Sequence, residues 1–179
     1  QYLRETADGW NASIDRWLYV RGNELAQLHE VEGYYARIAA PEHGDAASPC
    51  QGFVPIKNRP PDEASGPAAL MVSLDALAFV RFGLRAPDDP RILSTVKVID
   101  ATLKVETPRG PVWRRYQGDG YGEHADGGPY DGTGVGRGWP LLTGERAHYE
   151  LAAGNRAGAQ ALLGALEGFA SDGHLLPEQ

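Results

Sequence analysis

The stretch WRRYQGDGYGEHADGGPYDGTGVGRGWPLLTGERAHYEL, residues 113–151, decides how the rest of the chain is organised. It joins a long glycine-rich loop to a segment with helical periodicity. A loop of this length without regular structure is usually either disordered or functional. Disordered segments are poor in aromatic residues, whereas tryptophan and tyrosine flank and interrupt this loop. We therefore expect an ordered loop that forms one wall of a binding site.

The composition is that of an ordinary globular domain. The chain has 179 residues, of which 42% are hydrophobic and 23% charged, so it can bury one substantial core. Its net charge of -7 disfavours nucleic acids and anionic membranes as partners, because both attract basic patches. The single cysteine, Cys50, excludes an intrachain disulfide, and no apolar run is long enough to cross a bilayer.

Hydrophobic periodicity predicts a chain of helices. Asp89 and Pro90 are placed to begin one of them, and Gly83 and Gly154 to end two others. Prolines break the segment 20–67 repeatedly, so we predict it to be irregular apart from a short strand around Tyr34, Tyr35 and Ile38. The predicted helices span residues 2–19, 68–82, 90–105, 141–153 and 156–170. In the helix 90–105 the predicted buried residues are Ile92, Leu93, Val96, Ile99 and Leu103.

Helices joined pairwise, with long irregular loops between them, indicate an all-α chain of helical hairpins. No sequence period is tight enough for a solenoid repeat. The alternative is an α/α toroid, in which the hairpins close into a double ring. Functional groups would then lie on loops at one end of a rigid helical body.

The glycine-rich run 132–138 does not fit a phosphate-binding loop. The G-x-G-x-x-G spacing needs glycine where Arg137 stands, no predicted strand precedes the run, and the Walker sequence is absent. A second hypothesis is that loop carboxylates bind a hard cation. Turn formation explains these acidic residues equally well. The acidic residues concerned are Asp119, Glu123, Asp126 and Asp131. No zinc-binding spacing of histidine and cysteine exists, so we do not expect a zinc site, and we assign no residue as a metal ligand.

Aromatic residues flank two arginines in and around this loop, and two interpretations remain open. One is that they fill gaps beneath a long loop. The other is that they form a platform for a saccharide, whose apolar faces stack on rings while charged groups bind its hydroxyls. The residues concerned are Trp113, Tyr116, Tyr121 and Trp139, with Arg115 and Arg137.

Near the C-terminus, Glu178 follows Leu-Leu-Pro, where a carboxylate could act as a general base or simply be solvated.

Glutamates on the predicted helix that follows the loop are weaker candidates. Glu145 and Glu150 could reach a site on the loop, or make ordinary contacts on the helix surface. We expect His148 to be a packed or surface histidine.

Several of these segments resemble the bacterial glucoamylase and glucodextranase family, glycoside hydrolase family 15. The resemblance is carried by WRRYQGDGYGE (113–123), GRGWPLLTGERAHYELAAG (136–154) and DGHLLPEQ (172–179), and extends to YLRETADGW (2–10) and FVRFGLRAPDDPRI (79–92). It spans nearly the whole chain. It implies an (α/α)6 barrel, a six-hairpin toroid, that cleaves α-glucans from their non-reducing ends with inversion, releasing β-glucose.

The resemblance also implies roles for individual residues. The family's LPEQ loop carries the general base, here Glu178. The W-x-R-Y step carries an arginine that binds the terminal glucose, here Arg115 beside Tyr116. The tryptophan of the GR-x-WP step lies against the sugar and is Trp139 here. Tyr121 and Glu123 of GDGYGE are expected to shape the same pocket.

One departure from the family is large. The family's general acid lies in a Trp-Glu-Glu motif upstream of the region where this chain starts, and no such motif occurs here. We therefore expect residues 1–179 to be a single partial domain, the C-terminal half of the catalytic barrel, cut from a longer protein and inactive alone. Its expected partners are an α-glucan and the other half of the barrel, as a separate chain or by self-association.

The remaining expectations also follow from the resemblance. No cofactor is required, although a structural calcium ion would be compatible with the loop acids. The full-length protein is expected to be extracellular or periplasmic. The alternatives are a glucodextranase with α-1,6 preference, another α/α-barrel enzyme such as a trehalase, a non-catalytic glycan-binding fragment, or a purely structural helical domain.

Overall fold

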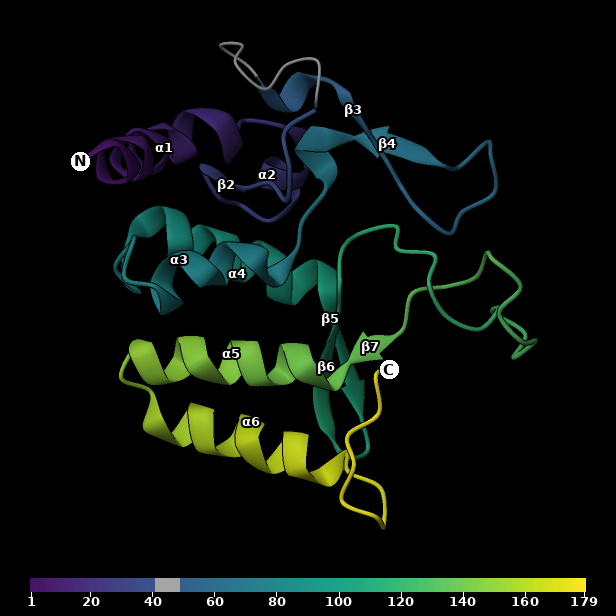
Figure 1. Cartoon of the computed structure of the whole chain (residues 1–179). Coiled ribbons are helices and arrows are strands. Elements are labelled where there is room, and N and C mark those ends of the chain that lie inside the picture. The colour runs from purple at the N-terminus through teal and green to yellow at the C-terminus, as the bar shows by residue number, and fades with distance from the viewer. Residues whose placement is uncertain (41–48) are drawn as a thin grey trace.

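The computed structural model describes residues 1–40 and 49–179 (Figure 1). Residues 41–48, which belong to the segment predicted to be irregular, lie outside the described residues. The helices are α1 (Tyr2–Leu18), α2 (Glu24–Leu28), α3 (Ala78–Arg81), α4 (Pro90–Leu103), α5 (Pro140–Ala152) and α6 (Arg156–Gly168), with the 3-10 helices η2 (Pro49–Gln51), η3 (Ala68–Leu70) and η4 (Leu74–Leu77). The strands are β1 (Tyr19–Arg21), β2 (Gly33–Tyr35), β3 (Phe53–Pro55), β4 (Ser65–Pro67), β5 (Lys104–Thr107), β6 (Gly110–Arg114) and β7 (Gly138–Trp139).

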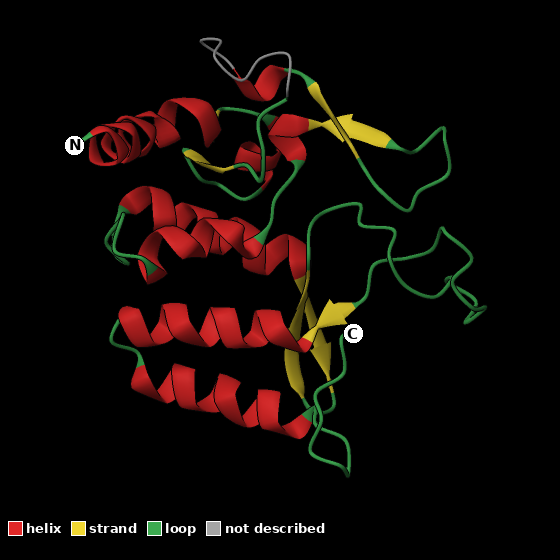
Figure 2. Cartoon of the chain, in the orientation of Figure 1, coloured by secondary structure: helices red, strands yellow, loops and turns green. Residues whose placement is uncertain are grey.

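The prediction of a purely helical chain is wrong in one respect, because the helices are accompanied by small sheets (Figure 2). Within the described residues the antiparallel sheets have the orders β1-β2, β3-β4 and β5-β6-β7. Their strands are two to five residues long, too short for an alternating pattern to be read from sequence. Tyr34 and Tyr35 do lie in a strand, as predicted, whereas Ile38 lies outside it and is exposed.

Four of the predicted helices are confirmed as α1, α4, α5 and α6. The Asp89 carboxylate accepts a hydrogen bond from the Arg91 backbone amide at 2.8 Å, and Pro90 occupies the first turn of α4. Gly83 and Gly154 adopt positive φ angles of 72° and 79° just beyond the helices they end. The prediction that Leu93 is buried is wrong, since half of its surface is exposed.

The predicted helix 68–82 is broken into η3, η4 and α3. Between η3 and η4 the backbone is extended at residues 71–73, where it bonds to other segments instead of to itself. The Met71 carbonyl accepts from the Arg37 amide, and the Val72 carbonyl accepts from the Gln117 amide. Ser73 then caps η4 by accepting from the Asp75 amide at 3.3 Å. Tertiary hydrogen bonds thus override the helical propensity of an apolar run.

The segment 107–111, predicted only to end a helix, contains the turn 108–109 of the β5–β6 hairpin. The Thr107 hydroxyl donates to the Gly110 carbonyl at 2.7 Å and accepts from the Arg109 amide at 3.2 Å. Gly110 has φ 121°, and a Cβ there would lie 2.5 Å from the Cβ of Ala165 on α6. Glycine therefore both permits this turn and lets the hairpin pack against α6.

The main core lies between the two tyrosines of β2, the buried face of α4 and Trp113 of β6. The fully buried large side chains there include Tyr34, Tyr35, Ile92, Ile99, Leu103 and Trp113. In Figure 1 the helices form successive rows, α1, then α3 and α4, then α5, then α6. The β3–β4 and β5–β7 sheets and the long loop before β7 lie at one side of these rows, and the α5–α6 connection lies at the other.

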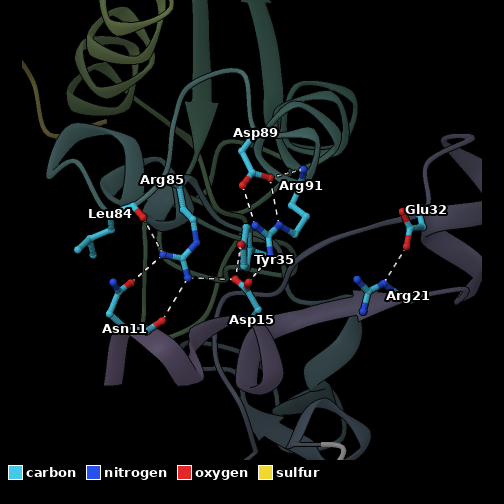
Figure 3. Close-up of polar contacts among 9 residues, drawn as sticks. All are labelled: Asn11, Asp15, Arg21, Glu32, Tyr35, Leu84, Arg85, Asp89 and Arg91. Carbon is cyan, nitrogen blue, oxygen red and sulfur yellow. Dashed lines mark hydrogen bonds and ion pairs between the residues drawn. The ribbon is translucent and has the colours of Figure 1, made fainter. Parts of the chain in front are cut away.

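Helix α1 contributes no fully buried residue to the core. Its Asp15 carboxylate accepts hydrogen bonds from Tyr35 at 2.6 Å and Arg85 at 3.1 Å, and pairs with Arg91 (Figure 3). Arg85 also donates to Asn11 at 2.7 Å. A polar network therefore joins α1 to the body of the molecule, and the partly buried Ile14 and Leu18 also pack against the main core. No helix among the described residues is long and apolar enough to cross a membrane.

Candidate functional site

Strands β6 and β7 place two of the predicted site residues. They pair antiparallel, with Trp113 opposite Trp139 and Arg114 opposite Gly138, so Arg115 follows β6 beside the start of β7. A Cβ on Gly138 would lie 2.3 Å from a methyl carbon of Val112, so only glycine permits this close approach. The loop 115–137 therefore begins and ends at the same pair of strands.

Trp113 belongs to the core and not to a ligand platform. Its side chain is 2% exposed, and its indole nitrogen donates to Asp100 at 3.0 Å. Asp100 also accepts from Arg146 of α5 at 2.8 and 3.1 Å. Trp113 thus joins α4, β6 and α5 beneath the loop. For this one aromatic residue, the interpretation as loop packing is the correct one.

Arg115 lies among three aromatic rings. Its guanidinium carbon is 4.7 Å from the ring centroid of Trp139, 5.1 Å from that of Tyr121 and 5.6 Å from that of Tyr116. We call Arg115 and these three rings the Arg115 cage. The rings of Tyr121 and Trp139 are themselves 6.1 Å apart. Cations are attracted to ring faces at such distances, so the arrangement both orients the arginine and presents aromatic surface beside it.

Asp119 fixes the direction of the Arg115 guanidinium. Its two carboxylate oxygens accept from Nε and Nη2 of Arg115, both at 2.7 Å, and its side chain is 1% exposed. It also accepts from the Tyr121 amide at 3.0 Å, which holds the loop. These hydrogen bonds from Arg115 to Asp119 outweigh partial burial and raise the pKa of Arg115 above its usual value. The arginine is therefore a fixed cation.

The C-terminal tail brings Glu178 to the same place. Its carboxylate accepts a hydrogen bond from the Tyr121 hydroxyl at 3.4 Å, although 57 residues separate the two in sequence. The structure thus brings together Arg115, Tyr116, Tyr121, Trp139 and Glu178. Glu178 itself is exposed, so solvent water has access to its carboxylate.

Glu123 does not join this group. Its carboxylate is 3.9 Å from Arg137 and 68% exposed. With Arg137 and Gln179 it lines a neighbouring hollow of about 580 Å³, to which Arg115 does not contribute. Of the predicted binding residues, Glu123 is the one that the fold sets apart.

The other loop acids have turn and ion-pair contacts. Asp126 accepts from the Gly128 amide at 2.9 Å, and Asp131 from the Thr133 amide at 3.2 Å. These are the turn contacts that the sequence also allowed. The described part of the chain contains no group of three or more histidine, cysteine, aspartate or glutamate residues that could hold a metal ion.

The charged residues of α5 make contacts within the helical body. Glu145 pairs with Arg81 of α3, and Glu150 accepts from Arg146 one turn earlier on α5. His148 lines a groove between α5 and α6. These residues therefore make helix-surface contacts, which was the plainer of the two interpretations.

Sequence reasoning missed two residues that contact the Arg115 cage. Asp119 was considered only as a cation ligand or a turn residue, although its position four residues after Arg115 is a spacing at which a salt bridge can form. Arg37 gave no sequence signal. Its guanidinium carbon lies 4.4 Å from the ring centroid of Tyr116, and only tertiary structure joins these residues.

Comparison with known proteins gives a consistent result, although no family model matches the chain. The chain is 41% identical over its whole length to a glucoamylase of Clostridium sp. (strain G0005), of which it covers 24%. The crystal structure of a bacterial glucoamylase complexed with acarbose matches 98% of this chain and 24% of that one, with a TM-score of 0.85 and 40% identity. The chain therefore spans about a quarter of the length of these relatives. Along that quarter, the resemblance to bacterial glucoamylases expected from the motifs is confirmed.

Proposed function

We propose that this chain is part of a glucoamylase-type glycoside hydrolase, which releases glucose from the non-reducing ends of α-glucans. The observation that carries the proposal is the Arg115 cage beside Glu178, in a chain 41% identical to a glucoamylase. Aromatic faces stack against the apolar faces of a sugar, and a fixed guanidinium donates to its hydroxyls. Tyr116, Tyr121 and Trp139 supply those faces, and Arg115 supplies the donors. Glu123 shapes the adjoining wall.

The proposed reaction is inverting hydrolysis, with Glu178 as general base. Its carboxylate takes a proton from water as that water attacks the anomeric carbon, while an acid outside this chain protonates the leaving oxygen. An inverting enzyme keeps these two carboxyl groups about 6.5–9.5 Å apart, so that the water fits between base and sugar. The exposure of Glu178 and its contact with the Tyr121 hydroxyl support the assignment.

The test uses the full-length protein with maltotriose. Proton NMR of fresh product should show β-glucose first, and α-glucose first would contradict inversion. Glu178→Gln should lower kcat by a factor of at least about 100, because that is the contribution of a general base, while acarbose still binds. Glu167→Gln, at an exposed site on α6, is the control and should keep kcat unchanged. Near-normal turnover by Glu178→Gln would exclude it as the base.

We also propose that residues 1–179 form half of an (α/α)6 barrel whose other half covers their exposed apolar side chains. Trp10, Leu141 and Leu151 are 64%, 65% and 57% exposed, and covering these large apolar side chains would remove apolar surface from water. Alone, the chain should associate in sedimentation velocity experiments and show no turnover. A monomeric chain with full activity would contradict this. Because its substrate would be polymeric, we place the full-length protein outside the cytoplasm, which cell fractionation tests.

A further inference from the structure

The extended segment 71–73 lies between two parts of the chain that are far apart in sequence. On one side the Arg37 amide donates to the Met71 carbonyl at 2.6 Å. On the other, the Gln117 amide donates to the Val72 carbonyl at 3.3 Å, and Ser73 forms an antiparallel bridge with Tyr116. Val72 and Ser73 are buried. This segment therefore sets where Arg37 stands relative to Tyr116.

The Arg37 side chain uses that placement to contact the Tyr116 ring. Its guanidinium carbon is 4.4 Å from the ring centroid, closer than that of Arg115 at 5.6 Å. The Arg37 Nε is 3.8 Å from the carboxylate of Asp75, which in turn accepts from the Ser73 hydroxyl at 2.8 Å. The guanidinium thus lies beside an acid and over an aromatic face. Only 35% of its side chain is exposed, so the contact is partly screened from water.

We propose that Arg37 is a positioning residue of the candidate sugar site and acts through Tyr116. The proposal rests on the proposed function, because it concerns how the same site is preorganised. Tyr116 shares its ring with two cations, Arg115 inside the cage and Arg37 from the segment after β2. The second cation fixes the ring orientation before sugar arrives, which lowers the entropy lost on binding. Arg37 itself need not touch the sugar.

The experiment compares Arg37→Met with Arg21→Met in the full-length protein. Arg21 is a matched control, because it also lies over a tyrosine ring, that of Tyr19 at 4.9 Å. It also pairs with a carboxylate, that of Glu32 at 2.9 Å, as Figure 3 shows. Arg37→Met should lower kcat/KM for maltotriose about threefold to tenfold, mainly through KM, as expected for a cation–aromatic contact. Arg37→Lys should restore most of the loss. Arg21→Met should stay within about twofold of the parent.

A double-mutant cycle distinguishes action through Tyr116 from a general effect on folding. In a Tyr116→Ala background, Arg37→Met should cause no further loss, because the ring it orients is gone. Equal kcat/KM for Arg37→Met and Arg21→Met would overturn the proposal, and so would a full additional loss in the Tyr116→Ala background. Arg37→Gln replaces the methionine variant if circular dichroism shows that variant unfolded. A parent enzyme inactive on maltotriose would instead refute the proposed function.

Discussion

At the scale of single residues, the candidate site depends on one buried carboxylate. Asp119 is 1% exposed on its side chain and accepts three hydrogen bonds, two from Arg115 and one from the Tyr121 amide. A carboxylate buried to this extent is stable only when it is paired and hydrogen-bonded. The same contacts fix Arg115 among its aromatic neighbours. Asp119 therefore serves both the loop and the arginine that the loop presents.

Asp119→Asn should weaken both stability and sugar binding. The amide cannot accept from both guanidinium nitrogens, and it leaves the charge of Arg115 unpaired. Because the Arg115 side chain is 32% exposed, solvent compensates in part, and we expect a loss of about 1–2 kcal/mol in the free energy of unfolding. Acarbose affinity of the full-length protein should fall about tenfold. Urea unfolding and calorimetric titration measure these two quantities.

Asp126→Asn provides the control for that substitution, since Asp126 only accepts from a turn amide in the same loop. Asparagine can accept the same bond, so its stability should change by less than about 0.5 kcal/mol. Equal stability and affinity in Asp119→Asn and Asp126→Asn would show that the ion pair does not organise the site.

At the scale of secondary-structure elements, glycines decide how closely strands and helices approach. Gly138 sits opposite Arg114 in the β6–β7 pair, which sets Trp139 beside Arg115. Any side chain at position 138 would collide with Val112 of β6. The position of Trp139 in the Arg115 cage thus depends on Gly138, which has no Cβ.

Gly138→Ala and Gly9→Ala should have opposite effects on stability. At position 138 the added Cβ would lie 2.3 Å from Val112, so the strands must separate, at a cost of about 1–3 kcal/mol. At position 9, within exposed helix α1, nothing lies within 4 Å, so alanine should stabilise by about 0.5–1 kcal/mol. Thermal unfolding monitored by circular dichroism measures both. A neutral Gly138→Ala would mean that β7 does not pack as described.

At the scale of the whole molecule, charge pairs hold α1 to the rest of the chain. Partial burial alone would raise the pKa of Asp15, but hydrogen bonds from Tyr35 and Arg85 and the charges of Arg85 and Arg91 outweigh it, so this pKa lies below 3.8. Burial and the hydrogen bond to Asp15 raise the pKa of Tyr35 to about 12, so its hydroxyl stays protonated and keeps donating. The network is therefore intact across neutral pH.

The attachment of α1 should weaken in acid. Because the pKa of Asp15 is lower in the folded state than in the unfolded state, its stabilisation is complete above about pH 4 and is lost as pH falls through the folded value. Asp15→Asn should cost about 1 kcal/mol at pH 7, after allowance for a side chain that is 34% exposed. The difference from the parent should shrink below about pH 4. Asp8→Asn, at an exposed site on the same helix, is the control, and a difference independent of pH would contradict the mechanism.

Much of the fold could be predicted from sequence, because its helices are long and their caps are local. Asp89, Pro90, Gly83 and Gly154 begin or end helices through contacts within a few residues. Apart from β2, the strands and the break at residues 71–73 could not be predicted, since they depend on partners distant in sequence. Short strands carry too few residues for an alternating pattern, and the helical propensity of Met71 is overridden by a tertiary hydrogen bond.

The candidate site could also be predicted only in part from sequence. The sequence by itself determined the chemical groups, which are an arginine, aromatic rings and a C-terminal carboxylate in motifs similar to those of bacterial glucoamylases. Only the tertiary structure decided which groups meet. In the folded chain Trp113 is buried in the core, and Glu123 lies outside the Arg115 cage. Asp119 pairs with Arg115, and Arg37 contacts the ring of Tyr116. The physical reason is that side-chain chemistry is local to a residue, whereas hydrogen bonds and ring contacts depend on strand pairing between segments many residues apart.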